Sequence, residues 1–157
     1  MGPLVSAEQH ERVMGYIEAG KRDGATVLMG GDSPDSDGGY YVNPTILTDV
    51  NPQMSVVREE IFGPVVVAQR FEDLNDVVRE ANDTPYGLAG YVSADTVESA
   101  RRVGRRIRAG NVNLQGVPND RTAPFGGYKQ SGNGREWGKY GLEEYLEVKA
   151  VAGYNAA

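Results

Sequence analysis

The sequence has no cysteine and only one histidine, His10, among its 157 residues. Without cysteine the chain can form no disulfide, no thiolate metal site and no thiol nucleophile of its own. A single histidine excludes a metal site built from several histidines, and we expect neither a bound metal nor a His-based catalytic triad.

Positive charge and long apolar runs are also scarce. The 16 Lys and Arg are outnumbered by 22 Asp and Glu, which gives a formal net charge of −6 and disfavours nucleic acid or an anionic membrane as a partner. No apolar run approaches the length of a membrane span, and residues 1–6 lack the basic segment and apolar core of a secretory signal. We therefore expect a cytoplasmic protein.

Glycine and proline, by contrast, are abundant, with 21 and 8 residues, and they predict many turns and loops. Between the turns, hydrophobic periodicity defines the elements. Ser6 and Gln9 have the spacing of a capping box, and the helix that follows places Val13 and Ile17 on one face. Short apolar strands are predicted at 25–29, 65–68, 88–92, 112–115 and 148–153.

Two helical patterns separate the middle strands, which gives a β-α-β-α-β succession typical of parallel pairing. The valine-rich strand at 65–68 indicates burial on both faces. The predicted fold class is α/β, an open, mostly parallel sheet flanked by helices.

The segment Glu59-Glu60-Ile61-Phe62-Gly63-Pro64 carries the most chemical information. Two adjacent acids precede an aromatic residue and a Gly-Pro turn that leads into a predicted strand. On spacing alone, a helix end with solvated acids is the favoured interpretation. The functional alternative is that the turn directs one carboxylate toward a polyol, as when dinucleotide ribose is bound through two vicinal hydroxyls.

This segment resembles a motif of the NAD(P)-dependent aldehyde dehydrogenases, and similar stretches follow the order of that family along nearly the whole chain. They include Gly15-Tyr16-Ile17, Asn43-Pro44-Thr45, Tyr86-Gly87-Leu88-Ala89, 124–132, Gly134-Arg135-Glu136 and Glu147-Val148-Lys149. The resemblance implies the carboxyl-terminal part of such an enzyme. It also implies a catalytic-domain portion at residues 1–146 and a terminal oligomerisation strand at 147–157.

By the same resemblance, Glu60 binds the hydroxyls of the nicotinamide ribose and Phe62 packs near the nicotinamide ring. Gln9 and Arg12 match positions near the adenosine ribose, although a solvated helix face is an equal alternative. The loop 116–123 corresponds to the wall of the aldehyde tunnel, which makes Val117, Asp120 and Phe125 substrate-binding candidates. Because this loop is polar and charged, a substrate other than a simple long-chain aldehyde is expected if the loop faces the tunnel.

The resemblance implies an enzyme that oxidises an aldehyde to a carboxylic acid with NAD or NADP. The family's thiolate, general base and oxyanion-hole asparagine lie upstream of this region, so we nominate no catalytic residue and expect the isolated chain to be inactive. Because most contacts to the cofactor are missing as well, we expect the chain alone to bind NAD or NADP weakly or not at all. The alternative is a non-catalytic structural or interaction domain that complements a separate cysteine-bearing chain. Unpaired strand edges in either case predict self-association or docking with the missing amino-terminal part.

Five arginines between Arg101 and Arg108 form a basic run. The run suggests either a phosphate or nucleic-acid patch or the solvated face of an amphipathic helix. The acidic composition and the lack of interleaved aromatic residues favour the solvated face.

Overall fold

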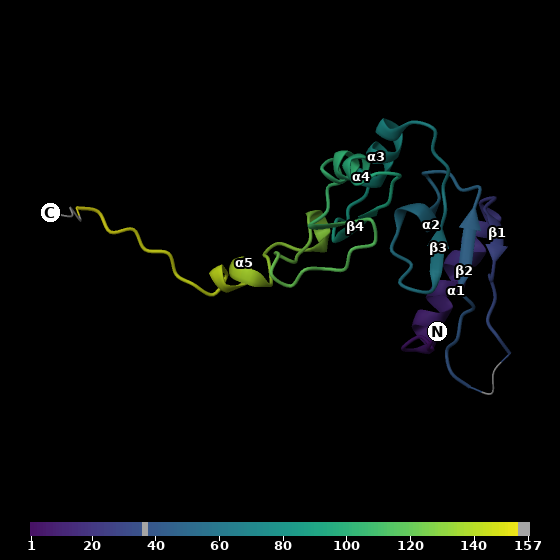
Figure 1. Cartoon of the computed structure of the whole chain (residues 1–157). Coiled ribbons are helices and arrows are strands. Elements are labelled where there is room, and N and C mark those ends of the chain that lie inside the picture. Colours follow the sequence, from purple (N-terminus) through teal and green to yellow (C-terminus); the bar gives the residue numbers. More distant parts are fainter. Residues whose placement is uncertain (36–37, 154–157) are drawn as a thin grey trace. The chain divides into compact units, whose positions relative to one another are not determined.

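A computed structural model describes residues 1–35 and 38–153. The chain divides into two compact units, Met1–Glu72 and Asp73–Ala157, and each has its own small sheet with helices packed on it (Figure 1). Of the three strand pairings in the described residues, two are parallel and one is antiparallel. The predicted fold class, α/β with a mostly parallel sheet and flanking helices, is therefore confirmed.

The first unit is organised around helix α1 (Ala7–Arg22). The helix begins where the sequence predicts, because Ser6 Oγ accepts a hydrogen bond from the backbone N–H of Gln9 at 3.2 Å. α1 packs against strand β1 (Thr26–Met29) and against the short helix α2 (Ser55–Arg58). Its apolar stripe is fully buried at Val13 and Ile17, and these side chains form one core with others of the unit.

The sheet of this unit has the order β1-β2-β3, with β2 (Thr45–Thr48) in the middle and β3 (Val65–Val67) at one edge. β1 runs antiparallel to β2, whereas β3 runs parallel to it, with Thr45 opposite Val65. The prediction that residues 65–68 are buried on both faces is wrong for this chain, since Val66 is 59% exposed. Alternation explains the difference, because Val65 and Val67 pack toward the core and Val66 points to the opposite face.

The second unit contains helix α3 (Leu74–Asn82), strand β4 (Ala89–Val92), helix α4 (Val97–Gly104) and strand β5 (Asn111–Leu114). β4 and β5 pair in parallel, and α4 crosses between them and packs on both. A 3₁₀ turn (Lys129–Ser131) and helix α5 (Gly138–Glu143) follow. Within the described residues β3 pairs with β2 and not with β4, so the expected β-α-β-α-β run is divided between two sheets.

Side-chain caps define where α3 and α4 begin. Asp73 accepts from the backbone N–H groups of Asn75 and Asp76 at 2.7 and 3.1 Å, and Thr96 accepts from that of Ser99 at 3.1 Å. The hydrogen bond from Asn75, followed by that from Asp76, holds the pKa of Asp73 below its ordinary value. The carboxylate form is therefore the one that caps α3.

The terminal strand predicted at 148–153 is absent from the described part of the chain. The residues of this segment favour a strand, but within residues 1–35 and 38–153 no strand pairs with it to form the ladder hydrogen bonds. Val148 is 97% exposed and Val151 is 73% exposed. In the described residues, no helix is long and apolar enough to cross a membrane.

Candidate functional site

The turn that follows α2 presents two side chains to solvent. Glu59 ends the helix in an extended conformation, with φ −112° and ψ 154°, and the side chain of Glu60 is exposed. Ile61 then turns inward and is buried in the core of the first unit. Phe62 turns outward again and is 75% exposed. A buried aliphatic residue thus anchors the turn between an exposed carboxylate and an exposed aromatic ring.

Phe62 has an unusual backbone conformation for an aromatic residue. Its φ is +58°, in the left-handed region that L-residues with bulky side chains rarely adopt. Such a conformation costs about 1–3 kcal/mol and persists only where surrounding contacts determine it. Strain of this kind is concentrated at functional sites, so an exposed ring held in this way is a reason to look for a ligand that contacts it.

Two side chains of α1 hold the backbone of this turn. Gln9 Nε2 donates to the carbonyl oxygens of Ile61 and Phe62 at 3.2 and 2.9 Å, and Arg12 Nη2 donates to that of Glu60 at 3.3 Å. The sequence predicts a role for both side chains near the cofactor, and the structure brings them against the backbone of the turn that carries Glu60 and Phe62. Their contact with ribose remains a prediction.

The turn also packs closely on the body of α1. A Cβ atom on Gly63 would lie 2.5 Å from Cγ2 of the fully buried Val13, so only glycine fits without displacing the helix or the turn. α1 therefore holds the turn in two ways. Gln9 and Arg12 donate hydrogen bonds to its backbone, and the Val13 side chain packs directly against Gly63.

A further contact was not anticipated from the sequence. The phenol of Tyr16 donates to Glu59 Oε2 at 2.7 Å, and Arg12 Nη2 donates to the same phenol oxygen at 3.2 Å. Gln9, Arg12 and Tyr16 have the spacing i, i+3, i+7, so they form a polar stripe beside the apolar stripe of the helix. This polar stripe could have indicated that the helix contacts another segment on that side. Helical periodicity does not identify the segment, because Glu59 lies 43 residues further along the chain.

Two of the three substrate candidates line one pocket of the second unit. Val117 and Asp120 face a cavity of about 530 Å³ whose other walls include Val97, Arg101 and residues of β5. Asp120 accepts from the hydroxyl and the backbone N–H of Thr122 at 2.7 and 2.8 Å. These bonds, the hydroxyl's first, lower the pKa of Asp120 below its ordinary value, so the loop presents a carboxylate at neutral pH.

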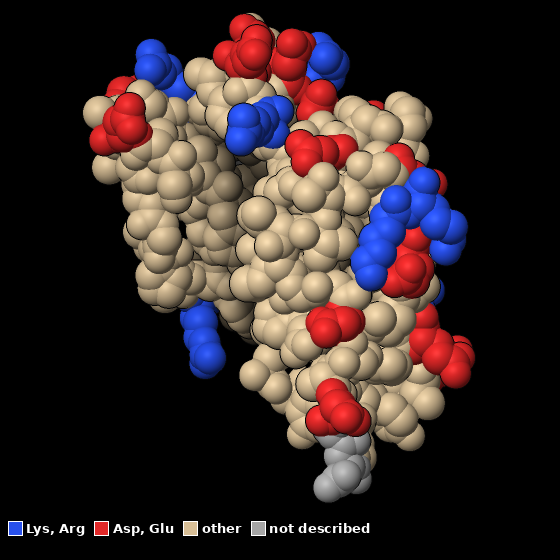
Figure 2. All heavy atoms as spheres, turned by 90° about the vertical axis from the view of Figure 1, so that its right-hand side faces the viewer, with Lys and Arg blue, Asp and Glu red and all other residues tan. Residues whose placement is uncertain are grey.

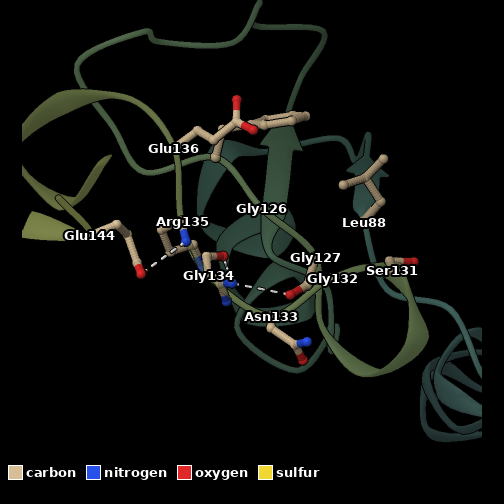
Figure 3. Close-up of a pocket in the computed structure, with 11 residues that line it drawn as sticks. Leu88, Gly126, Gly127, Ser131, Gly132, Asn133, Gly134, Arg135, Glu136 and Glu144 are labelled. Carbon is tan, nitrogen blue, oxygen red and sulfur yellow. Dashed lines mark hydrogen bonds between the residues drawn. The ribbon is translucent and has the colours of Figure 1, made fainter. Parts of the chain in front are cut away.

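Phe125 lies apart from those two candidates. Its ring stacks on Trp137 with centroids 4.6 Å apart, and it lines a different cavity, of about 300 Å³. Figure 3 shows other residues that line this cavity, among them Leu88 and Arg135. In that cavity Arg135 donates from its guanidinium to Gly127 O at 3.1 Å and from its backbone N–H to Glu144 Oε1 at 3.3 Å. The three candidates therefore do not form a single pocket wall within this unit.

All five side chains of the arginine run are exposed, but α4 ends at Gly104, so only Arg101 and Arg102 lie on the helix and the helical part of the second interpretation is wrong for the other three. Arg102 donates to Ser99 Oγ at 3.1 Å and Arg106 to Asn75 Oδ1 at 2.9 Å. On the face of the molecule that Figure 2 draws, basic and acidic side chains are interspersed. In the described residues, no group of three or more His, Cys, Asp or Glu side chains is arranged to hold a metal ion.

Comparison with known proteins decides which family this arrangement belongs to. A family model described as "Aldehyde dehydrogenase family" matches residues 1–151. The chain belongs to the aldehyde dehydrogenase family. A 3-succinoylsemialdehyde-pyridine dehydrogenase from a Pseudomonas species is 52% identical over 159 residues, which cover 100% of this chain and 33% of that protein. The chain thus spans about a third of the length of the curated relatives that it matches.

Solved structures of the family agree with the fold. The aldehyde dehydrogenase of Mycobacterium tuberculosis, solved with NAD+, matches with a TM-score of 0.92 and 39% identity, over 99% of this chain and 33% of that one. A mutant of aldehyde dehydrogenase C from Pseudomonas syringae, solved with NAD+ and octanal, matches with a TM-score of 0.93 and 44% identity, over 99% and 32%. The family is one of oxidoreductases, and aldehyde oxidation is its activity.

Proposed function

We propose that this chain supplies the nicotinamide-facing edge of the cofactor site in an NAD(P)-dependent aldehyde dehydrogenase, of which it forms the carboxyl-terminal part. The proposed reaction of the whole enzyme is oxidation of an aldehyde to a carboxylic acid with reduction of NAD or NADP. Phe62 carries the proposal, because its exposed ring is held at a φ of +58° beside the exposed carboxylate of Glu60. The pairing suits a ligand that combines a polyol with a flat ring.

The residues present fit the ribose and ring of a nicotinamide nucleoside. A carboxylate accepts hydrogen bonds from two vicinal hydroxyls, and an aromatic ring offers an apolar face to a planar heterocycle. When bound, the nicotinamide supplies the hydride acceptor. Glu60 orients the ribose and Phe62 limits the positions open to the ring, while Gln9 and Arg12 border this edge from α1. None of the four takes part in bond making.

The chain has no thiol to form the covalent adduct from which hydride leaves, because it contains no cysteine. We therefore propose that it is inactive alone and acts with a cysteine-bearing complement. Within this arrangement Val117 and Asp120 form one wall for the aldehyde, in which Asp120 supplies a charge, and Phe125 forms an apolar wall. We propose that residues 1–146 form part of the catalytic domain. Residues 147–157 then form the segment that joins a sheet of a neighbouring subunit.

Changing Glu60 to alanine is expected to weaken NAD binding to this chain by about tenfold, because a charge-assisted hydrogen-bond acceptor is lost. The measurement is a titration with NAD followed by NMR of the Phe62 ring and amide signals. Glu72→Ala, which removes an exposed carboxylate from the same unit, is the matched control. Phe62 signals that do not respond to NAD, or an unchanged affinity in Glu60→Ala, would overturn the proposed role.

Self-association is expected through the terminal segment. Tyr145 is 88% exposed and Val148 is 97% exposed, and their apolar area lies in a stretch that has no strand partner in the described residues. Sedimentation at increasing concentration should show dimers or larger species. Removing residues 146–157 should return the chain to a monomer, and a monomeric full chain at high concentration would contradict the proposal.

A further inference from the structure

Two adjacent glutamates stand at the candidate cofactor edge, and among the described residues a hydrogen-bond partner is found for the side chain of Glu59 and not for that of Glu60. Tyr16 Oη donates to Glu59 Oε2 at 2.7 Å. Arg12 lies over the ring of the same tyrosine, with its guanidinium carbon 5.3 Å from the ring centroid, and donates to its phenol oxygen at 3.2 Å. Arg12 also reaches Glu60, but through the backbone carbonyl, at 3.3 Å.

This difference distinguishes the two carboxylates. Tyr16 holds the Glu59 carboxylate on α1, which leaves the exposed carboxylate of Glu60 available to a ligand on the side away from the helix. Arg12 reinforces both parts of this arrangement, since it contacts the phenol that holds Glu59 and the carbonyl of Glu60.

We propose that Arg12, Tyr16 and Glu59 form a positioning brace that selects Glu60 as the outward-facing carboxylate of the turn. The inference rests on the proposed function in one respect, which is that Glu60 faces a cofactor ribose. The contacts themselves belong to this chain and can be tested without the rest of an enzyme. The brace acts through Glu60 and touches no reacting atom.

Because the residues of the brace are accessible to solvent, their effect on the position of Glu60 can be measured apart from their effect on global stability. Arg12 and Glu59 are exposed and Tyr16 is half-buried, so their hydrogen bonds compete with water and contribute little to global stability. Removing the phenol hydroxyl is therefore expected to shift the melting temperature by no more than about 4 °C. The order of the turn should respond more, because the brace and the two bonds from Gln9 hold a turn in which Phe62 has a strained backbone.

The decisive experiment replaces Tyr16 with phenylalanine and measures backbone ¹⁵N order parameters at Glu60, Ile61 and Phe62 in the full chain by NMR. These order parameters are expected to fall from about 0.85 to below about 0.6, with those in the core of α1 unchanged, as for a local loss of order. Glu59→Ala removes the bond between Tyr16 and Glu59 and should give a similar fall, and the double variant should add little, because the two residues share that bond. Glu59→Gln keeps an acceptor for the phenol and should keep the order parameters high, whereas Tyr40→Phe removes a hydroxyl elsewhere in the unit and serves as control.

An NAD titration of the same variants distinguishes the brace from the proposed function. If Glu60 points outward in only a third of Tyr16→Phe molecules, the apparent Kd for NAD rises about threefold. Unchanged order parameters at residues 60–62 in both Tyr16→Phe and Glu59→Ala overturn the brace, whatever the affinity. Lower order parameters in both, together with an NAD response that is absent even in the unmodified chain, support the brace and overturn the cofactor role.

Discussion

Replacing Gly63 with alanine is expected to lower the free energy of unfolding of the first unit by about 2 kcal/mol or more. The added methyl group would lie 2.5 Å from Cγ2 and 2.9 Å from Cγ1 of Val13. Val13 is fully buried in the core that α1 shares with the sheet, so its branched side chain has no free space into which to move. The turn or the helix must shift instead.

A double-mutant cycle tests this explanation directly. Val13→Ala removes the two methyl groups that an alanine at position 63 would meet, at a cost of its own from the cavity that it leaves. With both changes, the loss in unfolding free energy should fall short of the sum of the single losses by about 1 kcal/mol or more. Gly15→Ala is the control, because its added methyl group meets nothing within 4 Å and should stabilise α1 by up to about 1 kcal/mol.

Chemical denaturation of the unmodified chain, the two single variants and the double variant supplies the free energies of unfolding for the cycle. Additive losses in the cycle would show that Gly63 and Val13 do not compete for the same space, and the packing argument would fail. Coupled losses would mean that the turn bearing Glu60 and Phe62 is joined to the core of α1 at atomic contact. The position of the candidate cofactor edge then depends on the packing of that helix.

Local chemistry made the elements of this chain predictable from sequence. α1 starts at the cap formed by Ser6 and Gln9, and its buried residues are those of the apolar stripe. The helices after 73 and 96 also lie where hydrophobic spacing placed them. These features depend on residues three or four positions apart, which interact directly along one helix face.

Pairing between distant strands was less predictable, because it depends on which partners are available. The valine run at 65–67 forms a strand as expected, but periodicity gave no sign that β3 would pair with β2 and leave Val66 exposed. The segment 148–153 has strand-forming residues and no strand beside it in the described part of the chain. Strand propensity describes how a segment fits a sheet, and the sheet must be supplied by other segments.

In the candidate site, too, local features were predictable from the sequence and contacts between distant residues were not. The motif placed Glu60 and Phe62 beside a turn, and both side chains are exposed in the structure. It could not show that Gln9 and Arg12 bind the backbone of that turn, since 52 and 48 residues separate the bonded groups. Likewise, Val117 and Phe125 are close in sequence yet line different cavities, because Phe125 stacks on Trp137.

Gly110 is where the second unit should be least tolerant of change. A Cβ atom there would overlap the carbonyl oxygen of Gly126, and backbone cannot rotate away as a side chain can. The neighbouring groups are already engaged, since Gly110 N–H donates to Gly87 O at 2.9 Å and Asn111 Nδ2 donates to Pro124 O at 3.1 Å. Gly110→Ala is therefore expected to destabilise the unit by about 3 kcal/mol.

Gly104 offers a matched comparison in the same unit. Its added methyl group would meet Leu114 Cδ2 at 2.9 Å, which is the far end of a flexible side chain, and alanine favours the helix that Gly104 ends. Gly104→Ala should therefore change the unfolding free energy by less than about 1 kcal/mol. Similar losses for the two variants would contradict close docking of residues 124–126 on β5. A large loss confined to Gly110→Ala would show that this docking holds Phe125 in place. The cavity that Phe125 lines would then depend on glycine at position 110.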